Sequence, residues 1–91
     1  MDAHEAIAKA KAHVASMFEG EGISNIGLEE IEFVEDARLW QVTVGFSRPW
    51  DQQEGIVASL GGRRNRTFKL VTIRDSDGSV LAVKHRDLAF I

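Results

Sequence analysis

The last third of the chain contains two strand-like segments separated by a turn. Residues 66–74 and 79–85 are rich in β-branched and aromatic side chains. Between them lies Asp75-Ser-Asp-Gly78, and an Asp-Gly pair flanked by two such segments is a strong short-range signal for a β-hairpin. The hairpin predicts a domain that is built around a sheet.

A helix is predicted for residues 3–18. Asp2 and Glu5 have the spacing of a capping box, in which each side chain accepts a hydrogen bond from the backbone N–H of the other residue. The segment is rich in alanine, and its apolar residues recur at helical spacing. These residues are Ile7, Ala10, Val14, Met17 and Phe18. Gly20 and Gly22 then favour the end of the helix.

Residues 28–35 and 38–47 predict two more strands. In the first, Ile31 and Phe33 lie on one face, while glutamates occupy the other. The second shows a clean period-two alternation of apolar residues with small or polar ones. Its apolar residues are Trp40, Val42, Val44 and Phe46.

Two segments without a regular pattern separate these elements. A Gly-rich connection covers residues 19–27. A long loop covers residues 48–65, since Pro49 cannot donate a hydrogen bond to a strand ladder. With the hairpin strands at 66–74 and 79–86, the predicted order is one helix followed by four strands.

The predicted fold class is α+β, with one N-terminal helix packed on a four-stranded antiparallel β-meander in a single domain, residues 1–91. The core is expected to combine Ile7, Ala10, Val14 and Phe18 with Ile31, Phe33, Trp40, Val42, Val44 and Phe46. In the third strand both alternating sets are apolar, so one of two pairs completes this core. The pairs are Val71 with Ile73 and Phe68 with Leu70. Because one helix covers only one face of a sheet, the long loop, a second copy or a partner is expected to cover the other.

The sequence predicts no catalytic, cofactor or metal site. The absence of cysteine excludes disulfides, thiol catalysis and cysteine-ligated metal. No Ser-His-Asp order, phosphate-binding loop, dinucleotide fingerprint or zinc spacing is present. His4 and His13 lie on opposite faces of the predicted helix, so they cannot share a metal ion. Asp75 and Asp77 are what the hairpin turn requires, since the downstream ligands of a calcium loop are missing.

The pattern of an Ala-rich helix, a Trp-x-Val-x-Val strand and a closing hairpin resembles the PepSY-like domains. More broadly, it resembles the cystatin-like arrangement of a helix on a sheet. The residues that carry the resemblance are Ala6, Ala10, Trp40, Val42, Val44, Phe68, Val71, Ile73, Asp77, Gly78 and Val80. It spans nearly the whole chain except residues 48–65. The resemblance implies a non-catalytic inhibitory or interaction module, of a kind that usually acts outside the cytoplasm.

Charge is distributed unevenly along the chain. Residues 1–47 carry three Lys/Arg against nine Asp/Glu, whereas residues 48–91 carry eight against five. The N-terminal residues lack the basic and apolar regions of a secretory signal, and no segment approaches the roughly 20 apolar residues that span a bilayer. A cytoplasmic location without membrane association is therefore expected, and the alternative is a secreted protein from which the signal has been removed.

Four residues in or beside the long loop are the candidates for an interaction site. Trp50 is a plausible anchor, because tryptophan dominates binding hot spots, although packing of the loop on the sheet also explains it. Arg63, Arg64 and Arg66 surround a flexible Gly-Gly pair and could meet phosphates or the carboxylates of a protein.

The predicted function is that of a small non-enzymatic module that binds a protein partner or a second copy of itself. The contact is expected through residues 48–66 or the uncovered sheet face. An alternative is a nucleic-acid accessory protein that uses the three arginines, although the chain is acidic overall. A third is a small-ligand carrier with a cavity between helix and sheet, which would require convergent polar groups.

Overall fold

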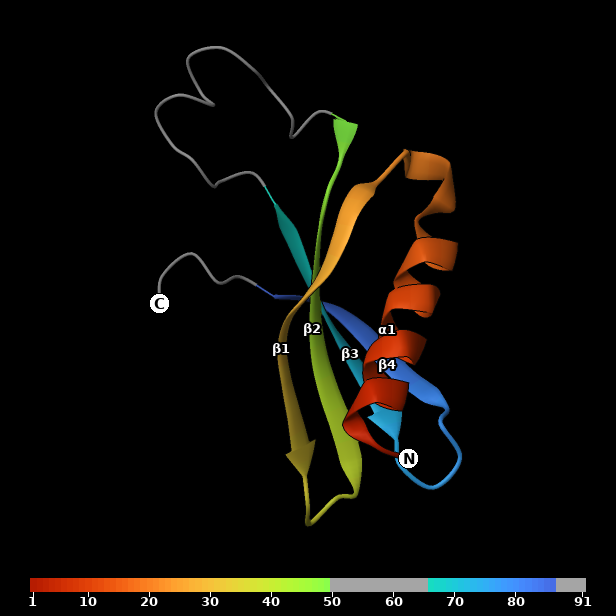
Figure 1. The fold of residues 1–91 in the computed structure, drawn as a ribbon, viewed down its shortest axis with the longest axis vertical. Helices are drawn as coiled ribbons and strands as arrows, with labels where there is room; N and C mark the ends of the chain where they lie inside the picture. The colour runs from red at the N-terminus through yellow and green to blue at the C-terminus, as the bar shows by residue number, and fades with distance from the viewer. Residues whose placement is uncertain (50–65, 87–91) are drawn as a thin grey trace.

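The computed structural model describes residues 1–49 and 66–86. Its elements are α1 (Ala3–Met17), the 3₁₀ helix η1 (Glu19–Glu21), β1 (Ser24–Val34), β2 (Leu39–Ser47), β3 (Thr67–Arg74) and β4 (Val80–Arg86). The strands form one antiparallel sheet in the order β1-β2-β3-β4, and α1 lies along one face of it (Figure 1). The predicted α+β class, one N-terminal helix on a four-stranded antiparallel meander, is confirmed.

Helix α1 begins at the predicted capping box. The Asp2 side chain accepts a hydrogen bond from the backbone N–H of Glu5, and the Glu5 side chain accepts one from the N–H of Asp2, each at 2.9 Å. At the other end, the N–H of Phe18 still donates to the Val14 carbonyl at 3.0 Å. Gly22 then adopts the left-handed conformation, with φ of 65°, and directs the chain back toward the sheet.

Strand β1 begins at Ser24 rather than at residue 28, so the end of the predicted Gly-rich connection belongs to the sheet. Its pairing with β2 is irregular between Ser24 and Gly27 and again between Leu28 and Glu30. In this segment Asn25 has a positive φ of 56°. A bulge inserts an extra residue and breaks the period-two alternation, which explains why the sequence pattern did not indicate this part of the strand.

The core lies between α1 and the sheet. Its fully buried apolar residues are Ala6, Ala10, Val14, Val42, Val44, Phe46, Val71 and Ile73. Val71 and Ile73 are therefore the third-strand pair that faces the helix. On α1 the expected core residue Ile7 is only partly buried, and Ala6 is buried instead. The small side chains of Ala6 and Ala10 allow the helix axis to approach the sheet closely.

We expect Ile73→Ala to lower the free energy of unfolding by about 2–5 kcal/mol, because it removes buried methyl and methylene groups and leaves a cavity. The matched control is Leu81→Ala. Leu81 lies on the neighbouring strand but is 45% exposed, so its truncation should change stability by about 0.5 kcal/mol or less. Denaturant unfolding followed by circular dichroism measures both. Equal losses for the two variants would contradict the assignment of the core.

Candidate interaction surface

The sheet face opposite α1, called the open face below, is defined by the strand register. Glu30 of β1 pairs with Thr43 of β2, Thr43 pairs with Leu70 of β3, and Leu70 pairs with Lys84 of β4. Directly paired residues share a face, and these alternate with the buried residues under the helix. Phe68, which lies two residues before Leu70, belongs to the same face. The open face thus carries charged residues together with half-buried apolar ones.

Arg86 extends across the open face from one edge strand to the other. Its Nη1 donates to the Thr43 hydroxyl at 2.8 Å, and its Nη2 lies 2.8 Å from Glu30 Oε1. Because Arg86 is on β4 and Glu30 on β1, the side chain passes over the two central strands. Thr43 is fully buried, so its hydroxyl requires a partner, and Arg86 supplies one.

A second arginine lies over the open face at Gly45. Arg66, which immediately precedes β3, places its Nη2 3.3 Å from Glu29 Oε2. A Cβ atom on Gly45 would lie 2.8 Å from that carboxylate oxygen and 2.9 Å from the guanidinium. The missing side chain at position 45 is therefore what allows the ion pair to rest against the strand.

The two ion pairs are held at the surface rather than in the core. The side chains of Arg66 and Arg86 are 30% and 36% exposed, and those of Glu29 and Glu30 are 32% and 55% exposed. Pairs at this exposure contribute about 0–1 kcal/mol each to stability. Their larger effect is to fix the positions of two guanidinium groups whose remaining N–H donors can reach a ligand.

Of the four interaction residues predicted from the sequence, Arg66 is the one that the structure describes. It is paired with Glu29 on the open face. Trp50, Arg63 and Arg64, with the rest of the predicted loop from residue 50 to residue 65, lie outside the described residues. Nothing in the sequence near Arg86 marks it as a site residue, because Thr43, which it contacts, is 43 residues away.

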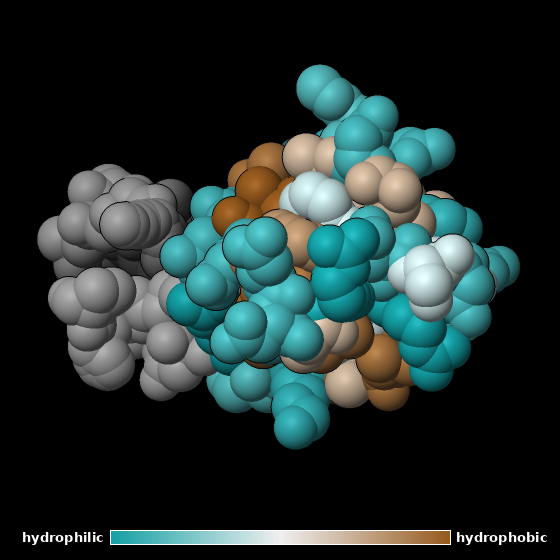
Figure 2. Space-filling view, turned by 90° about the horizontal axis from the view of Figure 1, so that it is seen from below, coloured by the Kyte–Doolittle hydropathy of each residue, from teal (hydrophilic) through white to brown (hydrophobic). Residues whose placement is uncertain are grey.

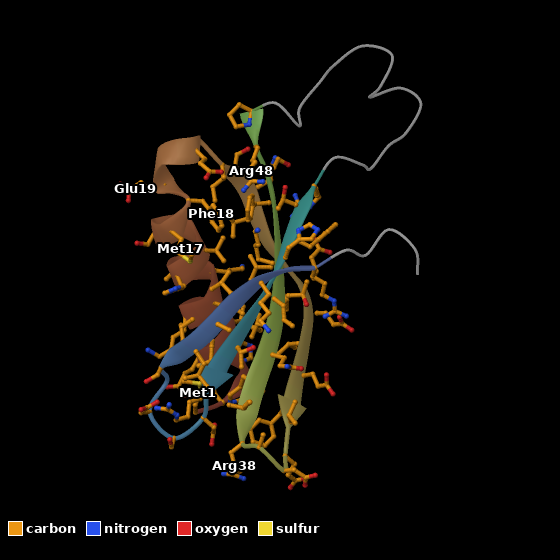
Figure 3. All side chains as sticks on the ribbon, turned by 180° about the vertical axis from the view of Figure 1, so that it is seen from behind. Met1, Met17, Phe18, Glu19, Arg38 and Arg48 are labelled. Atoms are coloured by element: carbon orange, nitrogen blue, oxygen red, sulfur yellow. The ribbon has the colours of Figure 1, made fainter. Side chains whose placement is uncertain are left out.

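Arg48, at the start of the predicted loop, lies on the helix side of the sheet. Its guanidinium carbon is 5.5 Å from the centre of the Phe18 ring and 5.4 Å from that of Phe46, and its Nε donates to Glu21 at 2.9 Å. Figure 3 shows Arg48 beside Phe18 near the C-terminal end of α1. This cation on two rings joins the end of β2 to the end of the helix.

Asp75 joins three parts of the chain at the opposite end of the molecule. Its carboxylate accepts a hydrogen bond from the Trp40 indole N–H at 2.9 Å and lies 3.4 Å from Arg38 and 3.7 Å from the amino group of Met1. The indole hydrogen bond is the main reason why the pKa of Asp75 is lowered. This end of the molecule is largely hydrophilic (Figure 2). Asp75 thus stabilises the fold beyond its predicted place in the turn.

The hairpin turn itself forms as the sequence predicts. The Asp77 side chain accepts a hydrogen bond from the Ser79 N–H at 2.9 Å, which is the main reason why the pKa of Asp77 is lowered. Gly78 has a φ of 74°, a conformation that side chains disfavour, and its N–H donates to the Arg74 carbonyl at 2.8 Å. Both aspartates are therefore used by the turn and its neighbours.

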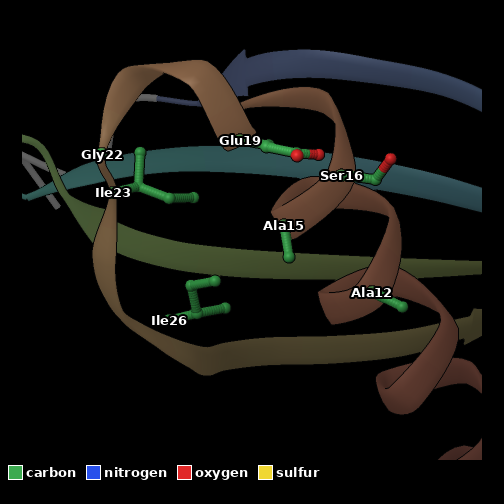
Figure 4. Close-up of a pocket in the computed structure, with 7 residues that line it drawn as sticks. All are labelled: Ala12, Ala15, Ser16, Glu19, Gly22, Ile23 and Ile26. Atoms are coloured by element: carbon green, nitrogen blue, oxygen red, sulfur yellow. The ribbon is translucent and has the colours of Figure 1, made fainter.

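An open groove of about 530 Å³ lies between the C-terminal half of α1 and the start of β1 (Figure 4). The helix contributes the small side chains of Ala12, Ala15 and Ser16, and the strand side contributes Ile23 and Ile26. The lining is mainly apolar. It does not supply the convergent polar groups that a small-ligand site requires.

Within residues 1–49 and 66–86, no group of three or more His, Asp and Glu side chains is placed to hold a metal ion. In the same part of the chain, no helix is long and apolar enough to cross a membrane. The chain matches no protein-family model and has no significant match among curated proteins or solved structures.

We expect Asp75→Asn to reduce the dependence of stability on acid pH. Because the pKa of Asp75 is lowered in the folded state, its carboxylate stabilises the fold above the unfolded-state pKa. That contribution is lost as the pH falls below about 4. The difference in unfolding free energy between wild type and Asp75→Asn should therefore be largest near pH 7 and narrow toward pH 2.

Asp36→Asn is the control for this measurement. Asp36 is exposed in the β1–β2 turn and makes no hydrogen bond or ion pair with another described residue. The difference in unfolding free energy between Asp36→Asn and wild type should stay small at every pH. If the difference in unfolding free energy between Asp75→Asn and wild type were constant across the pH range, the charge of the Asp75 carboxylate would not contribute to stability.

Proposed function

We propose that the protein is a non-catalytic module that binds another protein through the open face of its sheet. The observation that carries the proposal is the one-sided construction of the domain. Helix α1 packs on one face, while the other presents two arginines held in place by glutamates beside the half-buried Phe68 and Leu70. Arginine and aromatic side chains are enriched in protein interfaces.

The charge balance of this face favours a protein over a nucleic acid. Each of Arg66 and Arg86 is already paired with a glutamate of β1, and Glu32 and Lys84 add one charge of each sign. A nucleic-acid backbone is bound through an excess of positive charge, which the described residues of this face do not have. A protein surface, with both signs of charge and apolar side chains, is the better complement.

The area of the open face is smaller than the area that a stable protein interface buries on each side. Four strands of about eight residues cover roughly 500 Å², whereas each side of a typical stable interface buries about 800 Å². A partner bound to the face alone would therefore associate weakly. Residues 48–66, the contact region expected from the sequence, connect β2 to β3, and we propose that they supply the additional contact.

The test begins with affinity capture from a lysate of the source cell, with and without nuclease, and continues with the captured partner in purified form. We expect Leu70→Glu to weaken binding by about tenfold or more, because it places a charge in the centre of the contact. The matched control is Met17→Glu, on the opposite layer. Met17 is 52% exposed on α1, so the same kind of substitution there should leave the affinity unchanged.

Circular dichroism and thermal unfolding establish that both variants fold. If Met17→Glu reduced the affinity and Leu70→Glu did not, the partner would bind the helix layer and the proposal would be wrong. If the captured material were lost on nuclease treatment, the nucleic-acid alternative would take its place.

A further inference from the structure

From Glu30 to Val34, the outer edge of β1 is a free pairing edge within the part of the chain that the structure describes. The strand order places β1 at one side of the sheet, with β2 as its only described neighbour. From Glu30 to Val34 it pairs with β2 residue by residue, without a bulge. Alternate backbone N–H and C=O groups of such an edge strand point outward and can pair with another strand.

The open groove adjoins the same strand. Ile23 and Ile26 of its lining lie immediately before and within β1, and Ala12 and Ala15 face them from the helix. Figure 4 shows these side chains around the space between α1 and β1. Because the helix residues are small, the groove can accept a side chain of another molecule. Free backbone groups and an apolar recess thus occur along one edge.

The charge beside this edge indicates the chemistry of its occupant. Glu32 projects from the regular part of β1, Glu35 and Asp36 follow it in the turn, and Glu19 lies at the groove. Unlike Glu29 and Glu30, these four carboxylates have no ion-pair partner among the described residues. A strand laid beside them would be favoured if it carried positive charges.

We propose that β1 accepts an extended, basic segment of another protein as a fifth strand of the sheet. The segment carries Lys or Arg at alternate positions, opposite the carboxylates of β1, and places an apolar side chain in the groove. Addition of a strand to an exposed sheet edge is a general mode of peptide recognition, with backbone hydrogen bonds for affinity and alternate side chains for specificity. This inference concerns the edge and does not rest on binding at the open face.

A second copy of the chain is a poorer occupant. Two β1 strands would place like charges opposite one another, and so would two β4 strands, which carry Lys84, His85 and Arg86. Pairing of β1 with the β4 of another copy would match opposite charges, but each copy added would leave a free edge for the next. Such head-to-tail contacts do not close and lead to open-ended polymers.

The test uses the full chain, labelled with ¹⁵N, and a synthetic eight-residue peptide of alternating valine and lysine. We expect slowed amide hydrogen exchange and shifted resonances along Glu30–Val34 and at the groove. The Glu32→Lys variant should bind the basic peptide at least tenfold more weakly. Its control is Met17→Lys, which also adds positive charge, but at an exposed helix position outside the groove lining, and which should leave the affinity within about twofold of wild type.

Two further experiments separate the contributions that the backbone of β1 and the groove make to peptide binding. A peptide methylated on the backbone nitrogens of one edge should not bind, since it cannot pair with β1. Ala15→Leu should weaken binding by filling the groove, whereas His13→Leu, on the opposite side of the helix and outside the groove lining, should not. Equal binding of a valine–glutamate peptide would overturn the basic specificity. If the slowed amide exchange were confined to β4 or to the open face, the proposed edge would be wrong. If the slowing of exchange in β1 increased with protein concentration alone, the occupant would be a second copy of the chain and the proposed occupant would be wrong.

Discussion

The packing of a narrow helix face against the middle of the sheet is the contact on which the rest of the structure depends. Ala6 and Ala10 belong to the same buried cluster as Val44 and Val71, and all four are fully buried. In a domain of 91 residues a single interface of this kind supplies most of the apolar area removed from water. Within residues 1–49 and 66–86, α1 is the one α-helix, and the core lies on its side of the sheet.

The one-sided core determines how the opposite face is built. A bare apolar face would promote aggregation, whereas a wholly charged one would leave the central strands poorly shielded. Here the guanidinium groups of Arg66 and Arg86 lie at Gly45 and Thr43 and meet glutamates, so the stem of each side chain extends over the face to reach them. Long arginine side chains cover apolar surface in this way and keep their guanidinium groups near water. Among the described residues, these side chains shield the face in place of a second helix.

The features predicted from the sequence are those that neighbouring residues determine. The capping box at Asp2 and the turn at Gly78 involve residues three or four apart, and the alternation along β2 appears within nine residues. The choice between the two apolar sets of β3 could not be predicted, since both sets fit a strand equally well. It depends on which side the helix packs, which is a property of the whole fold.

The surface contacts between residues far apart in the sequence could not be predicted, for a related reason. Trp40 and Asp75 are separated by 35 residues, and each has a sufficient local explanation, as a strand residue and as a turn residue. The start of β1 was missed because bulges remove the alternation that identifies a strand. Of the predicted interaction residues, Arg66 belongs to the open face, but its partner Glu29 carried no signal that distinguished it from the other glutamates.

The position of Arg86 also has a consequence for the order of folding. In a meander each strand pairs with the next along the chain, so the sheet can grow by local steps with a low loop-closure cost. The contacts of Arg86 with Thr43 and Glu30 link the last strand to the first two and require β3 to be in place between them. They form only when every strand has joined. Their formation therefore marks the completion of the sheet. When either edge strand detaches, contacts of Arg86 break with it.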